Sequence, residues 1–197
     1  MTASAQASHL AQLNVATLRH PLDDPRVAPF VEMLDPVNAA ADGSPGFVWR
    51  LVEEGAEDAT GLRPAGEDVI VNLTVWQTQE ALWDFTYRSG HLEVMRRRRE
   101  WFERHVEAHL VLWWIPAGHL PTVGEALERL ADLRAHGPSP RAFTFSSAYT
   151  AAEAAEHLQA VPPAQSEHAA HDARPASPGL TRSDTTAGAE RIPLVGG

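Results

Sequence analysis

The sequence predicts an α+β protein built on one antiparallel sheet, and three observations lead to this fold class. Segments whose apolar residues recur at every second position are interspersed with segments whose apolar residues recur every three to four positions. Their order is strand, helix, strand, strand, helix, strand, with one more helix after it. The fourth strand, "HLVLWWIP" at residues 109–116, is apolar on both faces, so both faces of the sheet must be covered.

The elements of the first half are marked by their periods and their ends. Residues 9–18, "HLAQLNVATL", alternate between apolar and polar side chains as a strand does. Asp24 and Pro25 are typical of a helix start, and Gly43 marks the end of that helix. Two further strands are expected to form a hairpin with a long loop, at residues 46–54 and 68–76.

In the second half, residues 79–103 read as one helix with a weak point at Ser89-Gly90. Thr122, followed three residues later by Glu125, predicts the start of a further helix that ends at Gly137. Residues 141–147 are a candidate edge strand. This order predicts a ferredoxin-like antiparallel sheet with helices on one face. A second copy of the chain is the simplest cover for the other face, which predicts a homodimer.

Composition excludes several classes of function. The 197 residues carry a formal charge of −10, which disfavours nucleic acid and anionic membrane surfaces as partners. The absence of cysteine excludes disulfides, thiolate catalysis and cysteine metal sites, and fits a cytoplasmic location. No stretch approaches the length of a membrane span. We expect one folded domain at residues 8–149 and a disordered Ala/Pro/Ser-rich tail at residues 150–197, with a short helix near its start.

The segment "YRSGHLEVMRRRREWFERH", residues 87–105, supplies the candidate site. On a helical wheel the apolar residues Met95 and Phe102 centre on His91, which predicts that this imidazole points inward. Arg98 falls within about 20° of His91, whereas the other three arginines fall on the polar face. A buried guanidinium needs an anionic partner or a wet cavity. The alternative is that His91 is an ordinary core residue and that Arg98 extends to the surface or pairs with a carboxylate.

Polar residues on the strands point to the same space. They occupy alternate positions with apolar neighbours, so each strand turns a polar side toward one region between sheet and helices, or toward open water. The residues concerned are Gln12, Asn14, Arg50, Asn72, Thr74 and Trp76.

The segments "GFVWRL", "WQTQEALWDFTYRSGHLEVMRRRREWF", "LVLWWIPAGHLPTVGEALERL" and "HGPSPRAFTF" together resemble an uncharacterised bacterial family of the dimeric α/β-barrel superfamily, over about residues 8–146. This superfamily includes haem-dependent and cofactor-free antibiotic-biosynthesis monooxygenases. The resemblance implies a pocket between sheet and helices. In the haem-binding branches a helix histidine is the axial ligand, which makes His91 the candidate ligand here. The run "NLTVW", with Asn72 and Trp76, is similar to an Asn/Trp pair of the cofactor-free branch.

The resemblance implies a haem b monooxygenase acting on a small aromatic natural product, of the indole type in some relatives. His91 would then bind the iron, Arg98 or Arg50 would bind a propionate, and Arg98, Asn72 and Trp76 would serve catalysis. The remaining candidates are Met95 and Phe102 beside the haem and Trp49, Asn14 and Phe85 around the substrate. Two alternatives stay open: a cofactor-free monooxygenase in which His91 is the general base and Arg98 stabilises the anion, and a non-catalytic small-ligand-binding dimer.

Overall fold

The computed structural model describes residues 7–88 and 91–160 of the chain. Its sheet has four antiparallel strands in the order β2-β3-β1-β4. The helices α1, α2 and α3 connect them in the β-α-β-β-α-β order of the ferredoxin-like fold, which confirms the predicted fold class. The bounds of the strands are Ser8–Thr17 (β1), Phe47–Arg50 (β2), Val69–Trp76 (β3) and Leu110–Pro116 (β4). The bounds of the helices are Ala28–Asp42 (α1), Gln79–Arg88 (α2), His91–Arg97 (α3), Val123–His136 (α4) and Ala151–Ala160 (α5), with a 3₁₀ turn at Arg98–Glu100 (η1).

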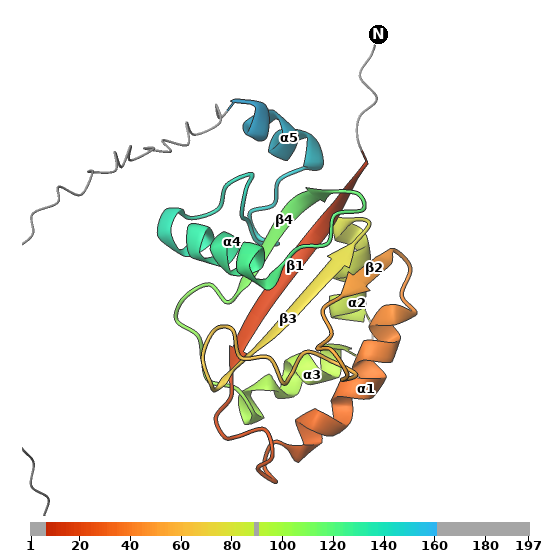
Figure 1. Ribbon diagram of the computed structural model, residues 1–197, viewed down its shortest axis with the longest axis vertical. Helices are drawn as coiled ribbons and strands as arrows, with labels where there is room; N and C mark the ends of the chain where they lie inside the picture. Colours follow the sequence, from red (N-terminus) through yellow and green to blue (C-terminus); the bar gives the residue numbers. More distant parts are fainter. Residues whose placement is uncertain (1–6, 89–90, 161–197) are drawn as a thin grey trace, which may run out of the picture. The chain divides into compact units, whose positions relative to one another are not determined.

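The two faces of the sheet bury different sets of side chains. On one face, which we call the α4 face, Leu13, Leu73 and Trp113 pack in one cluster with Leu130 of α4. On the other, which we call the α1–α3 face, Trp76 packs with Leu82 of α2, and Ile70 packs with Phe30 of α1. In Figure 1, α4 lies across β4 and β1 on one side of the sheet, and α2 and α3 lie behind it. The predicted single helical face therefore holds for α1, α2 and α3, while α4 takes the opposite face.

The position of α4 removes the reason for expecting a second copy over the sheet. Val111, Trp113 and Ile115 of β4 are 3% exposed or less within the single chain. Leu130 and Leu133 of α4 lie in the same cluster as these β4 side chains. The apolar second face of β4 is therefore covered inside one chain.

The helix ends follow the sequence signals in part. Thr122 caps α4 by accepting a hydrogen bond from the Glu125 backbone nitrogen at 3.1 Å, and Gly137 ends the helix with φ of 76°. The start predicted for α1 was wrong, because Asp24 accepts hydrogen bonds from the backbone and guanidinium of Arg26 and thereby closes a separate turn. The helix begins only at Ala28.

The predicted helix at 79–103 is three separate elements. The weak point, Ser89-Gly90, lies outside the described residues, and α3 begins directly after it. Residues 141–147 form isolated bridges, including Leu112 to Phe143, and no full strand. The short helix expected near the start of the tail is present as α5, whose Ala154 is buried. Among the described helices, none has the length and apolarity that a membrane span requires.

Candidate active site on the α1–α3 face

A chain of side-chain hydrogen bonds runs across β3 and β1 on the α1–α3 face. The Trp76 indole Nε1 donates to Thr74 Oγ1 at 2.9 Å, and Thr74 Oγ1 donates to Gln12 Oε1 at 2.8 Å. Gln12 Nε2 then donates to Asn14 Oδ1 at 2.8 Å. These residues lie on one face because Gln12 pairs with Thr74 in the register and alternate side chains of a strand share a side. Trp76, Thr74 and Gln12 are all buried.

The hydrogen-bond chain ends at Asn14, beside a part of the sheet that the helices leave uncovered and that we call the opening. Asn14 pairs directly with Asn72 in the β1–β3 register, which places both side chains on the same face about 5 Å apart. Asn72 is exposed, while Ile70 and Thr74, its neighbours on that face, are buried, and β2 pairs with β3 only as far as Thr74. The helices therefore leave the sheet uncovered at Asn72, and the half-buried Asn14 borders the same gap.

Three neighbouring rings, which we call the aromatic column, link Trp76 of the hydrogen-bond chain to His91 at the start of α3. Trp76 stacks on Phe85 of α2 with ring centroids 5.2 Å apart, and Phe85 lies 5.1 Å from the His91 ring. Burial lowers the pKa of His91, and the hydrogen bond to the Thr86 backbone partly opposes that shift. The ring nitrogen Nδ1 is 3.4 Å from the Thr86 carbonyl oxygen. His91 therefore points inward as predicted and is held in its neutral form at pH 7.

Arg98 lies elsewhere, and the prediction that it is buried beside His91 was wrong. It is exposed in η1, because α3 gives way to a 3₁₀ turn after Arg97 and the wheel of 100° per residue no longer applies. Burial, and then the charges of His105 and Arg98, lower the pKa of His109. The Arg98 guanidinium therefore lies near His109, just before β4.

Arg50 lies opposite Thr74 in the β2–β3 register, but its guanidinium binds groups outside the site, and Trp49 lies on the other face of the sheet. Arg50 forms an ion pair with Asp42 at 3.0 Å and donates to the Glu57 carbonyl oxygen at 2.8 Å, so it anchors the end of α1. The register of β2 shifts between Phe47 and Trp49, which sends Phe47 to Trp76 and Trp49 into the cluster on the α4 face. The expectation that Trp49 lines the substrate space was therefore wrong.

The remaining predicted residues divide between two clusters. Phe85 lies in the aromatic column beside His91. Phe102 instead packs edge-on against Phe30 of α1, with centroids 5.0 Å apart, in the cluster around Trp101. Met95 is half-buried on α3.

These positions do not fit a haem at His91. Two cations were expected at the haem propionates. Arg50 is paired with Asp42, and Arg98 is exposed to solvent. The His91 ring faces Phe85, and Phe85 in turn covers Trp76, which has no exposed surface. Within the described ranges, no group of three or more His, Asp or Glu side chains is placed to hold a metal ion either.

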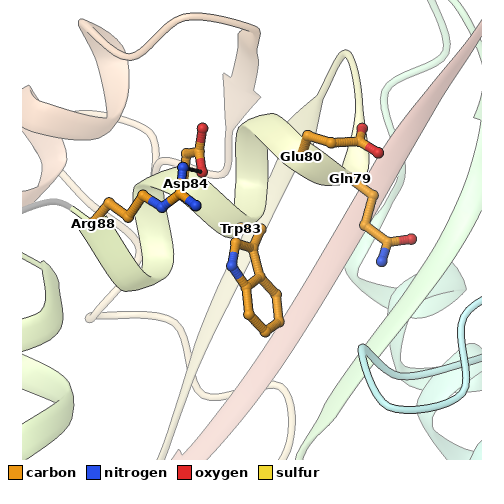
Figure 2. Close-up of a pocket in the computed structure, with 5 residues that line it drawn as sticks. All are labelled: Gln79, Glu80, Trp83, Asp84 and Arg88. Atoms are coloured by element: carbon orange, nitrogen blue, oxygen red, sulfur yellow. Dashed lines mark ion pairs between the residues drawn. The ribbon is translucent and has the colours of Figure 1, made fainter.

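Two shallow, open hollows border α2. One, of about 300 Å³, is lined by Gln79, Glu80, Trp83, Asp84 and Arg88, and Figure 2 shows Trp83 pointing away from the Asp84–Arg88 ion pair. The other, of about 310 Å³, lies between α2 and the start of α5, and Trp114 and Tyr149 line it. Neither hollow includes His91 or the two asparagines, so both are separate from the site described above.

Gln12 and Thr74 are the residues of the site to which sequence reasoning assigned no role. Both belong to the series of polar residues at alternate strand positions, and this alternation is the sequence feature that could have identified them as site residues. Their connecting function became visible only once the register placed Thr74 opposite Gln12.

The fold and site define an α+β protein of ferredoxin-like topology with two paired asparagines on a part of the sheet that its helices leave uncovered. Residues 9–160 match the model of a domain of unknown function, DUF3291, and the chain belongs to that family. This confirms the expected uncharacterised family. No curated protein matches the sequence significantly.

Solved structures with a similar arrangement share little sequence with this chain. SnoaB, a cofactor-independent oxygenase from Streptomyces nogalater, is 19% identical, with a TM-score of 0.39 over 58% of this chain and 97% of its own. A putative antibiotic biosynthesis monooxygenase from Chloroflexus aurantiacus is 15% identical, with a TM-score of 0.37 over 59% and 99%. A dabb family protein with a ferredoxin-like fold from Mesorhizobium loti is 14% identical, with a TM-score of 0.35 over 58% and 98%. At such scores these structures say nothing about the site residues of this chain.

Proposed function

We propose that the protein is a cofactor-free monooxygenase for a small, electron-rich phenol or enol that binds at the opening beside Asn14 and Asn72. The observation that carries the proposal is the exposure of Asn72, between buried neighbours on β3 and directly opposite Asn14. Two amide groups at a gap under helices offer hydrogen bonds to a ligand oxygen. The apolar clusters on both sides supply the walls that an aromatic ligand needs.

His91 is the proposed proton acceptor. Its lowered pKa keeps it neutral near pH 7, so it enters the reaction in the form that accepts a proton. The tautomer with the proton on Nδ1, directed at the Thr86 carbonyl oxygen, leaves Nε2 as the basic nitrogen. Phe85, which stacks on Trp76, packs against the His91 ring.

The proposed reaction takes place in the keto tautomer of the phenol or enol, in which a methylene group activated by the conjugated carbonyl is converted to a second carbonyl by dioxygen. The methylene loses one proton to His91, and the resulting carbanion is delocalised onto the conjugated carbonyl oxygen, which gives the phenolate that the asparagine amides stabilise. Dioxygen accepts the electron pair and forms a carbon–oxygen bond as a hydroperoxide, which takes up the proton. Loss of water then breaks the oxygen–oxygen bond and leaves the carbonyl. One oxygen atom enters the product and the other leaves as water with both methylene hydrogens, so the reaction needs no external reductant.

Oxygen uptake with anthrone as the substrate tests this proposal. We expect the protein to consume one dioxygen per carbonyl formed, above the rate without protein. Asn72→Ala and His91→Gln should lower that rate, while Gln77→Ala, an exposed residue just after β3, should not. Uptake equal to the rate without protein would contradict the proposal and favour a ligand-binding role if anthrone still binds.

An absorption spectrum of protein produced with added haem tests the haem alternative. The cofactor-free proposal expects no Soret band. A Soret band that disappears in His91→Ala would overturn it in favour of a haem protein, because the band reports direct ligation of the iron.

A further inference from the structure

We infer that Trp76, Thr74 and Gln12 act together as positioning residues that fix the Asn14 side-chain amide with its N–H groups toward the opening, so that the site selects a ligand oxygen that accepts hydrogen bonds. The ligand chemistry rests on the proposed function. The orientation of Asn14 follows from the hydrogen bonds of the free protein.

Trp76 sets the direction of donation along the hydrogen-bond chain. An indole nitrogen can only donate, so Thr74 Oγ1 must be the acceptor in its bond with Trp76. The single hydroxyl proton of Thr74 is then available for Gln12, and the oxygen of the Gln12 amide must face Thr74.

The same logic continues to the opening. Because the Gln12 oxygen is occupied, its NH₂ group is the end that faces Asn14, and Asn14 must present its oxygen in return. The Asn14 NH₂ group is left on the other end of the amide. Every donor in the series is directed toward Asn14. In such a series each hydrogen bond polarises the group that makes the next one and strengthens it.

The Asn14 NH₂ group is accessible. It has no hydrogen-bond partner among the described residues, and the only buried side-chain nitrogen or oxygen without a partner there is His9 Nδ1. The Asn14 nitrogen therefore reaches solvent at the gap shared with Asn72. A phenolate or enolate oxygen accepts from such a donor, whereas a neutral hydroxyl group gains less from it.

The pKa of bound 4-nitrophenol measures this selection, because its phenolate form absorbs visible light and its phenol form does not. We expect the wild-type protein to bind the phenolate about tenfold more tightly than the phenol, which lowers the pKa of the bound compound by about one unit. Thr74→Val removes the hydroxyl that orients Gln12 and should abolish most of that preference. Thr74→Ser restores the hydroxyl and should restore the preference.

Three further measurements keep the test decisive. Thr17→Val, the same substitution elsewhere in the sheet, should leave the preference unchanged. Gln12→Met breaks the chain at a second point and should reproduce Thr74→Val, which covers the case in which that variant does not fold. The NMR signal of the Trp76 indole proton should show slow solvent exchange in the wild type and faster exchange in Thr74→Val.

The outcomes separate the inference from the proposed function. An unchanged phenolate preference in both Thr74→Val and Gln12→Met would overturn the positioning role and leave the monooxygenase proposal standing. A wild-type protein that protects the Trp76 proton but binds no 4-nitrophenol in either form would overturn the selection and the proposed ligand chemistry, with the hydrogen-bond chain intact. Loss of the preference in both variants and its return in Thr74→Ser would support the inference.

Discussion

Trp76 Nε1 and Thr74 Oγ1 are 2.9 Å apart, two residues along β3, and both side chains are buried on the α1–α3 face. The bond ties the largest side chain of the cluster around Leu10 and Leu112 to the polar series that ends at Asn14. A single indole thus serves both the packing of the core and the orientation of the site.

Trp76→Phe removes that donor and part of a fully buried ring. We expect the free energy of unfolding to fall by about 2 kcal/mol, from lost packing and one lost hydrogen bond. Urea unfolding measures it. Trp83→Phe, whose indole is 41% exposed on α2, is the matched control and should change stability by less than about 0.5 kcal/mol. Equal losses in the two variants would contradict the assignment of Trp76 to the core.

Asn72→Ala should separate function from stability. The side chain is exposed and has no hydrogen-bond partner among the described residues, so its removal should change the free energy of unfolding by less than about 0.5 kcal/mol. Oxygen uptake with anthrone should nevertheless fall about a hundredfold, the scale of losing one donor to a developing anion. A variant with normal uptake would show that Asn72 does not contact the substrate.

Leu130→Ala tests the closure of the α4 face. Leu130 is 1% exposed and packs in the cluster that contains Leu13 and Trp113. We expect a loss of about 2–5 kcal/mol in urea unfolding, because the cavity cannot fully collapse. Leu120→Ala, at a side chain 50% exposed before α4, should cost less than about 1 kcal/mol. A small effect at Leu130 would mean that α4 is not what covers this face.

The stability of the protein should depend on the protonation of His91. Burial lowers the pKa of His91 in the folded state below its unfolded value near 6.5, so between these two values the unfolded chain binds more protons. The contribution of the neutral imidazole is therefore fully present above about pH 7 and is lost as the pH falls through the folded pKa.

Unfolding in urea at a series of pH values from about 7.5 to 5 measures this dependence. His105 and His109 also have lowered pKa values, caused first by burial, so the comparison with His91→Gln isolates the part due to His91. The variant should lose less stability than the wild type over this range. Parallel curves would show that His91 is not protonated differently in the folded and unfolded states.

The sequence by itself determined the element order, the fold class and the inward direction of His91. Strand alternation, the Thr122–Glu125 cap and the glycine after α4 are local signals, and local geometry is what periodicity and capping report. The polar series on the strands was also visible, because alternate residues of a strand share a face whatever the rest of the chain does.

Only the tertiary structure decided which of these residues meet. The 3₁₀ turn at Arg98–Glu100 moved Arg98 into solvent, and the register shift in β2 moved Trp49 to the α4 face. The placement of α4 across the sheet covered β4 within a single chain. The end of α3, the strand register and the choice of face are fixed by contacts between segments distant in the sequence, so a local pattern carries no record of them.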